Sequence, residues 1–358
     1  MKTVTTNKKC YINSLNGLKA IALIMIFWWH SPSHPSSPDI GARMTELFFV
    51  ASGFLIGYNH FDKRIDNVYN ESKQYTIKKL RIIFPLHLIA FVTVVISILW
   101  QNGAEYFTTE RVFTGFYSIL LLNAWSNNSS VFFAFNGAIW FLSSLMFCYT
   151  MYPVILQTLQ RSRKPYLYFA LFIMIRLFLE LQQTKWKWYG IEFNVHVSPI
   201  VRFFEFSAGM SLIPIFRLFD NYFGKLKNKF IYYSIMETII VFLYVYLVIM
   251  KNTEWIRGYF VILACIMIFI LSSDEGIVSK ILSFKPLVLF SSIQLQFFIL
   301  HQPIIKVYNT FFYKQNYSTN VVVIVLFFVV LLLAIIYKLL FEGIKRNLLT
   351  RKEKPKSN

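Results

Sequence analysis

Cysteine is nearly absent from this sequence, and charged residues are scarce. The three cysteines, Cys10, Cys148 and Cys265, lie far apart and lack the spacing of a metal or redox site. A disulfide framework is therefore not expected, and nothing in the sequence requires a metal or a permanently bound cofactor. Only 15% of the 358 residues are charged, whereas 56% are hydrophobic. That balance indicates a polytopic membrane protein.

Apolar runs of membrane-spanning length recur along the chain. A helix needs about 20 apolar residues to cross a bilayer. The runs predict an all-α bundle of about ten transmembrane helices in a single domain, residues 1–341, followed by a basic tail, residues 342–358. The predicted spans are residues 15–31, 44–60, 82–100, 135–157, 165–182, 198–216, 231–250, 256–273, 284–307 and 320–341.

The cations are distributed unevenly around these spans. With the N-terminus inside, 24 of the 36 Lys and Arg residues lie in inner segments, 8 lie on the opposite side, and the remaining four lie within spans. Cytoplasmic segments of membrane proteins carry such an excess. The pattern predicts that both termini are cytoplasmic. It also accounts for the net charge of +19 without a nucleic-acid partner.

Residues 111–125 are apolar but too short for a full span. Counting them as one would move Arg161 and Lys164 to the outer side, against the charge rule. We therefore expect a re-entrant or interfacial segment here. It lies in the longest external connection, residues 101–134, and long ordered loops often carry function.

Two polar residues lie at the same predicted depth, at the outer ends of the first two spans. His30 ends the first span, and Glu46 opens the second after a short connector. A carboxylate beside an imidazole fixes its tautomer and supports it as a general base. The alternatives are an interfacial histidine beside Trp28 and Trp29, and a carboxylate favoured by a helix N-terminus.

Lys19 and Ser52 lie in the same two spans. Lys19 precedes His30 by about 16 Å of helix, so it belongs to the inner half of the membrane. There it either binds an anionic substrate or extends its ammonium to the interface. The Ser52-Gly53-xxx-Gly57 pattern is more simply a close-packing face than a nucleophile, because small residues let helices approach. Ser52 is also a candidate for substrate or donor binding.

Several motifs follow one another in an order typical of one family. They are Asn16-Gly-Leu-Lys19, then His30, Glu46-Leu-Phe-Phe-Val-Ala-Ser52-Gly-Phe, Lys78-Lys-Leu-Arg81-Ile-Ile-Phe-Pro85, Trp140-Phe-Leu-Ser, Arg202-Phe-Phe-Glu-Phe-Ser-Ala-Gly209 and Phe298-Ile-Leu-His301-Gln-Pro303. Together they resemble the acyltransferase-3 family of integral-membrane acyl transferases, of the polysaccharide O-acetyltransferase type. Two positions depart from it, since the family usually has Asp and Arg where this chain has Asn16 and Lys19. Lysine keeps the charge but loses the planar bidentate fork of arginine.

The resemblance implies an O-acetyltransferase in a bacterial plasma membrane, in contact with its lipids. It would move an acetyl group from cytoplasmic acetyl-CoA to a hydroxyl of a cell-surface or lipid-linked glycan. His30 would be the catalytic base or a transient acyl carrier, oriented by Glu46. The anionic donor would meet the basic inner surface, where the candidates are Lys19, Lys78, Lys79 and Arg81.

Two pairs of opposite charges within predicted spans have helical spacing. Arg202 and Glu205 are three residues apart, and Arg176 and Glu180 are four apart. Both spacings favour ion pairs within one helix. The resemblance makes Arg202 a substrate-binding candidate as well.

His301 and Trp140 have two interpretations each. His301 either lines the acceptor side of the site or is a hydrogen-bonded core histidine before Pro303. Trp140 either stacks on a sugar or anchors the helix at the interface. For four further histidines the sequence indicates no partner: His34, His60, His87 and His196.

Two other functions fit the composition and the predicted topology. A transporter or flippase would move a glycan or acyl precursor without chemistry. The absence of an internal repeat and the matched depth of His30 and Glu46 both favour an enzyme over this alternative. An inactive scaffold of an envelope-synthesis complex is supported only by the departures at Asn16 and Lys19.

Overall fold

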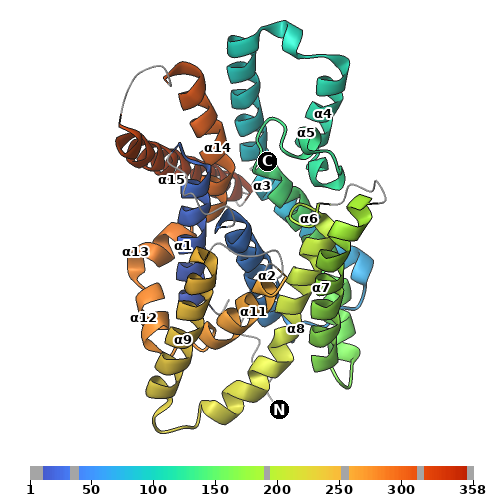
Figure 1. Cartoon of the computed structure of the whole chain (residues 1–358), viewed down its shortest axis with the longest axis vertical. Helices are drawn as coiled ribbons and strands as arrows, with labels where there is room; N and C mark the ends of the chain where they lie inside the picture. The colour runs from blue at the N-terminus through green and yellow to red at the C-terminus, as the bar shows by residue number, and fades with distance from the viewer. Residues whose placement is uncertain (1–10, 33–39, 189–193, 251–257, 313–317, 353–358) are drawn as a thin grey trace, which may run out of the picture.

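The computed structural model describes residues 11–32, 40–188, 194–250, 258–312 and 318–352, with side chains described for all of these except 184–188 and 342–352. Within these ranges the chain is helical and contains no strand (Figure 1). His34 lies outside the described residues. The α-helices are α1 (Asn13–His30), α2 (Ile40–His60), α3 (Val68–Asn102), α4 (Thr109–Ile119), α5 (Ser129–Phe132), α6 (Ile139–Arg161), α7 (Tyr166–Trp188), α8 (Pro199–Phe223), α9 (Lys229–Ile249), α11 (Phe260–Leu271), α12 (Ile277–Leu282), α13 (Lys285–Ser291), α14 (Gln294–Phe311) and α15 (Thr319–Lys352), and short 3-10 helices cover Ala104–Tyr106 and Asn123–Trp125.

Helix α2 is the centre of the bundle, and it packs against α1, α6, α8 and α11 (Figure 1). In its contact with α8 the two backbones approach closely. A Cβ atom on Gly53 would lie 1.8 Å from the Phe206 carbonyl oxygen, and one on Gly209 would lie 2.0 Å from that of Val50. Gly57 also faces α8, next to Met210. The predicted close-packing face of α2 is therefore confirmed.

The outer helices expose large apolar side chains. Such residues occur along α3, α9 and α15, and they include Ile96, Trp100, Ile239, Phe242, Leu332 and Leu339. Exposure of these apolar surfaces to water would be unfavourable, whereas in a bilayer they contact lipid chains. The chain is therefore an integral, multi-pass membrane protein.

Each of the ten predicted spans coincides with a helix or a helix pair, but fewer helices qualify as full spans. Among the described residues, seven helices are long and apolar enough to cross a membrane: α2, α3, α6, α7, α8, α9 and α15. The pair α13 and α14, bent by 72°, makes an eighth if it is counted as one span. Helix α11 has 12 residues, about 18 Å of helix, and α1 carries Lys19 and two asparagines. The count of ten and the cytoplasmic placement of both termini stay predictions.

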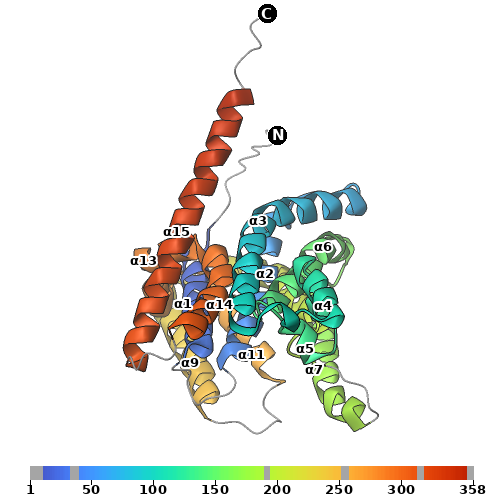
Figure 2. The same ribbon diagram turned by 90° about the horizontal axis from the view of Figure 1, so that it is seen from above.

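Two further predicted segments are helical. Residues 111–125 contain most of α4 and a 3-10 helix, and His87 of α3 donates from Nε2 to the Ser118 carbonyl at 3.0 Å. This contact gives His87 a structural partner and ties α4 to α3. Helix α15 continues into the predicted tail as far as Lys352, and Figure 2 shows its C-terminal end extending beyond the bundle. The re-entrant or interfacial character of 111–125 stays a prediction.

Candidate active site

His30 and His301 form a pair between α1 and α14. Nδ1 of His30 lies 2.9 Å from the Ile26 carbonyl oxygen, one turn back along α1. Nδ1 of His301 lies 2.6 Å from the Phe298 carbonyl oxygen. Because a carbonyl oxygen only accepts, both rings carry their proton on Nδ1. The His301 Nε2 lone pair then faces His30 Nδ1 at 3.4 Å.

This arrangement leaves Nε2 of His30 with its lone pair. Within the described part of the chain no hydrogen-bond partner is found for that atom, and His30 is only partly buried. A neutral imidazole with an available Nε2 is the form that a general base requires. The Ile26 carbonyl and His301 fix this tautomer, so no carboxylate is needed to do so.

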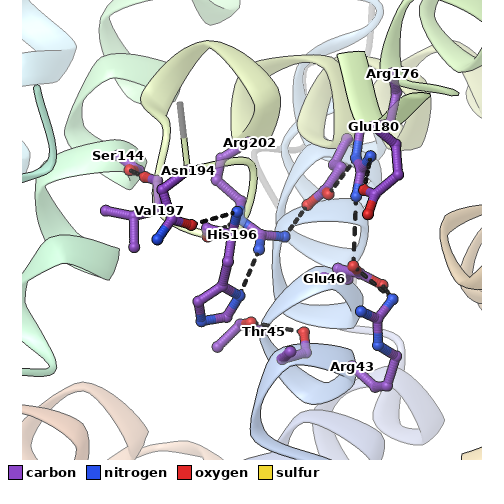
Figure 3. Close-up of polar contacts among 12 residues, drawn as sticks. Arg43, Thr45, Glu46, Ser144, Arg176, Glu180, Asn194, His196, Val197 and Arg202 are labelled. Atoms are coloured by element: carbon purple, nitrogen blue, oxygen red, sulfur yellow. Dashed lines mark hydrogen bonds and ion pairs between the residues drawn. The ribbon is translucent and has the colours of Figure 1, made fainter. Parts of the chain in front are cut away.

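Glu46 does not contact His30. Both of its oxygens accept from Nη1 of Arg43, each at 2.8 Å, and Nη2 of Arg176 lies 3.5 Å from one of them. Glu46 is 2% exposed. The predicted orientation of His30 by Glu46 is therefore corrected: α2 begins at Ile40, six residues before Glu46, and the Glu46 side chain points toward Arg176 of α7 (Figure 3). The catalytic roles of both residues stay predictions.

An ion network connects α2, α7 and α8 around Glu46 (Figure 3). Arg176 donates to Glu180 at 2.7 Å and to Glu205 at 2.8 Å, in addition to its longer contact with Glu46. Arg202 donates to the other oxygen of Glu205 at 2.6 Å. The two predicted intrahelical pairs are thus confirmed, and they are joined into one network. Three arginines and three glutamates balance each other, which burial at this depth requires.

Arg202 also holds a histidine that sequence reasoning left without a partner. Its Nε donates to the His196 carbonyl at 2.8 Å, and its Nη2 lies 2.9 Å from His196 Nδ1. The imidazole lies against Trp140, with ring centroids 4.6 Å apart. Trp140 is buried, and its two predicted roles, stacking on a sugar and anchoring the helix, stay predictions.

A cavity of about 440 Å³ lies between α1, α2, α3, α6 and α14. Three of the predicted donor-binding residues line it: Lys19, Ser52 and Lys79. The other polar lining residues are Tyr11, Asn16, Asn59, His60, Tyr75, Tyr149 and Gln294, and among all the described lining residues none is acidic. Such a cavity favours an anionic occupant.

The two cavity lysines are placed by aromatic rings. The Lys79 ammonium lies 4.7 Å from the ring centre of Tyr149 and 5.1 Å from that of Tyr75. Lys19 lies 5.9 Å from the ring centre of Phe48. By contrast, Lys78 and Arg81 are exposed and do not line the cavity. Of these three basic residues on α3, only Lys79 lines the cavity.

One aromatic layer separates the cavity from the histidine pair. Phe298 lines the cavity, and its ring centre lies 4.9 Å from Phe141 and 5.4 Å from His301. The cavity therefore reaches within one side chain of His301, which contacts His30.

Metal ligands are not grouped anywhere in the described residues, since no cluster of three His, Cys, Asp or Glu side chains suits an ion there. Sequence reasoning missed Arg43 and His196 as members of the site. The Arg43–Glu46 spacing of three residues was a usable signal. His196 offered none, because its partner belongs to the following helix.

Comparison with known proteins supports the resemblance seen in the motifs. No curated protein and no solved structure matches the chain. The model of the acyltransferase-3 family, described as an acyltransferase domain, matches residues 12–339. That match spans both the cavity and the histidine pair. The chain therefore belongs to the acyltransferase-3 family of membrane acyltransferases.

Proposed function

We propose that this protein transfers an acetyl group from cytoplasmic acetyl-CoA to a hydroxyl of a cell-surface or lipid-linked glycan, in the plasma membrane of a bacterium. The observation that carries the proposal is the relation of the cavity to the histidine pair. A cavity with two lysines and no acidic lining residue among those described ends one phenylalanine from His301 and its neighbour His30.

The donor is polyanionic at one end and neutral at the other. Its phosphates would contact Lys79 and Lys19, because charge-assisted hydrogen bonds to phosphate are about twice as strong as neutral ones. The pantetheine arm would lie along the apolar wall formed by Phe48, Leu145 and Phe141. Rotation of the Phe298 side chain would open the cavity to His30.

His30 would then act as a general base. Its Nε2 takes the proton of the acceptor hydroxyl as the oxygen attacks the thioester carbonyl carbon. The carbon–sulfur bond breaks, the CoA thiolate takes the proton back from His30, and the products are the glycan ester and free CoA. No external oxidant, reductant or metal enters this balance.

The test uses the full chain in nanodiscs with acetyl-labelled acetyl-CoA and a polysaccharide acceptor. CoA release and labelled glycan are measured for the wild type, His30→Ala and His30→Gln, and size-exclusion profiles confirm that the variants are folded. General-base catalysis contributes about 10² to 10⁴-fold, so both variants are expected to lose at least about 100-fold.

Two outcomes would contradict the proposal. Equal turnover of the wild type and the folded His30 variants would show that His30 is not a catalytic residue. A wild type that neither releases CoA nor labels a glycan, but moves a labelled glycan across vesicles, would make the protein a transporter.

A further inference from the structure

His196 is held rigidly in the segment before α8. Its backbone N–H donates to the Asn194 side-chain oxygen at 3.0 Å, and its carbonyl accepts from Arg202 Nε at 2.8 Å. Arg202 itself is 1% exposed and is anchored by Glu205. The position of the imidazole therefore depends on the buried ion network rather than on a freely moving loop.

The contact with Arg202 decides the tautomer of His196. A guanidinium has five N–H donors and no acceptor. Nδ1 of His196, 2.9 Å from Arg202 Nη2, must therefore be the accepting nitrogen. The neutral ring carries its proton on Nε2. This is the reverse of His30, whose Nδ1 carries the proton and whose Nε2 is the base.

His196 also stays neutral. Burial is the largest cause that places its pKa well below the ordinary value, and the positive charges of Arg202, Arg43 and Arg176 lower the pKa further. A row of ring contacts leads from His196 to the histidine pair: Trp140 lies against His196, Phe141 lies next to Trp140 and Phe298, and Phe298 lies next to His301. A neutral imidazole with an N–H can polarise a carbonyl group without surrendering a proton.

Nε2 of His196 has no hydrogen-bond partner among the residues that the structure describes. Figure 3 shows this nitrogen on the side of the ring that faces away from Arg202. Trp140 covers one part of the imidazole, with ring centroids 4.6 Å apart. The contacts with Arg202, Asn194 and Trp140 thus fix the orientation of the ring. The Nε2–H of His196 is available to a ligand.

We propose that His196 is a second catalytic residue, whose Nε2–H donates a hydrogen bond to the acyl carbonyl oxygen as it becomes an oxyanion. This rests on the acyl transfer proposed above. The acceptor oxygen forms its bond to the carbonyl carbon, its proton goes to His30 Nε2, and the carbonyl electron pair moves to the oxygen beside His196. When the carbon–sulfur bond breaks, that pair returns and the thiolate is protonated by His30. His196 keeps its proton throughout.

The proposed role predicts that removing the His196 N–H lowers kcat and leaves KM unchanged. A hydrogen bond that strengthens only in the transition state raises kcat and leaves substrate binding largely unchanged. Removing one oxyanion donor costs about 10² to 10³-fold in kcat. His196→Phe keeps a planar ring against Trp140 but has no N–H. His196→Gln has an amide N–H that reaches the former Nε2 position.

The experiment measures kcat and KM for acetyl-CoA in nanodiscs for the wild type, His196→Phe, His196→Gln and Asn194→Ala. The last variant removes the hydrogen bond that holds the segment and leaves the imidazole intact. We expect a loss of about 10² to 10³-fold in kcat for His196→Phe, an unchanged KM, and partial recovery in His196→Gln. Asn194→Ala should lose much less kcat than His196→Phe, because the imidazole and its contact with Arg202 remain.

The outcomes distinguish this inference from the proposed function. If His30→Ala is inactive while His196→Phe keeps the wild-type kcat, acyl transfer stands and the role of His196 is wrong. If His196→Gln is as impaired as His196→Phe and Asn194→Ala loses as much, His196 is structural. A wild type without any acyl transfer overturns both proposals together.

Discussion

Nε2 of His301 lies 3.4 Å from Nδ1 of His30, across 271 residues of sequence. His301 is fully buried, and the Phe298 carbonyl fixes its tautomer, so it presents a lone pair to the protonated nitrogen of His30. In the proposed reaction the His30 ring would become positively charged, and that lone pair would stabilise the imidazolium. We therefore predict that His301 is a positioning residue for the proposed base.

Replacing His301 should weaken catalysis without abolishing it. His301→Phe keeps an aromatic ring, though a larger one, and removes the lone pair, while the Ile26 carbonyl still holds His30. One hydrogen bond contributes about 0.5–1.5 kcal/mol, which corresponds to a loss of about 2- to 10-fold in kcat. Steady-state kinetics with the acyl donor check this. A loss as large as that of His30→Ala would mean that His301 is itself the base.

Lys79 and Lys78 provide a matched pair for donor binding. Both are on α3, but only Lys79 lines the cavity. Lys79→Met should raise the Kd for CoA about tenfold or more, because a charge-assisted hydrogen bond contributes about 1.5 kcal/mol or more. Lys78→Met should leave it nearly unchanged at 0.15 M salt. Isothermal titration with CoA measures both. Equal effects of the two substitutions would show that the anion binds the surface and not the cavity.

Glu46 is expected to act mainly on stability. Glu46→Ala leaves Arg43 buried without its carboxylate, and breaking a buried pair costs about 3–5 kcal/mol. The double variant Arg43→Met/Glu46→Met removes both charges and should be less destabilised than the single one. Thermal unfolding in detergent micelles reports the difference. A normal melting temperature in an inactive Glu46→Ala variant would instead indicate that Glu46 has a role in catalysis.

Gly53 and Gly115 are both helical glycines, in unlike surroundings. A Cβ atom at position 53 would lie 1.8 Å from a backbone oxygen of α8, whereas one at position 115 would lie 3.4 Å from the Phe135 side chain. Gly53→Ala should therefore cost at least about 1–3 kcal/mol by overpacking, and Gly115→Ala should be tolerated, because alanine favours helices. Folded yield after solubilisation compares them. Tolerance of Gly53→Ala would disprove the close α2–α8 contact.

The sequence was sufficient for much of the fold because hydropathy and helical spacing are local. Each predicted span contains a helix, and the Arg202–Glu205 and Arg176–Glu180 pairs follow from positions three and four residues apart on one helix. The joining of these pairs to Glu46 depends on how α2, α7 and α8 are rotated against one another. No local sequence pattern determines how these helices are rotated against one another.

The error at Glu46 has the same origin. Depth in the membrane can be counted along a helix, but the direction of a side chain around the helix axis is set by its tertiary neighbours. His30 does end α1, but α2 begins six residues before Glu46, and Glu46 contacts Arg43 and Arg176 while His30 contacts His301. His301 and Arg202 were already candidates, but only the structure brings His30 to His301 and His196 to Arg202.

The ion network of Arg43, Arg176, Arg202, Glu46, Glu180 and Glu205 has a formal charge of zero. A charge that moves through the membrane potential gains or loses about 2.3 kcal/mol per 100 mV, but a neutral cluster does no such electrical work. The membrane potential therefore exerts no net force on the ion network around the proposed site. The voltage across the bilayer would act instead on the proposed anionic donor and on the cavity lysines.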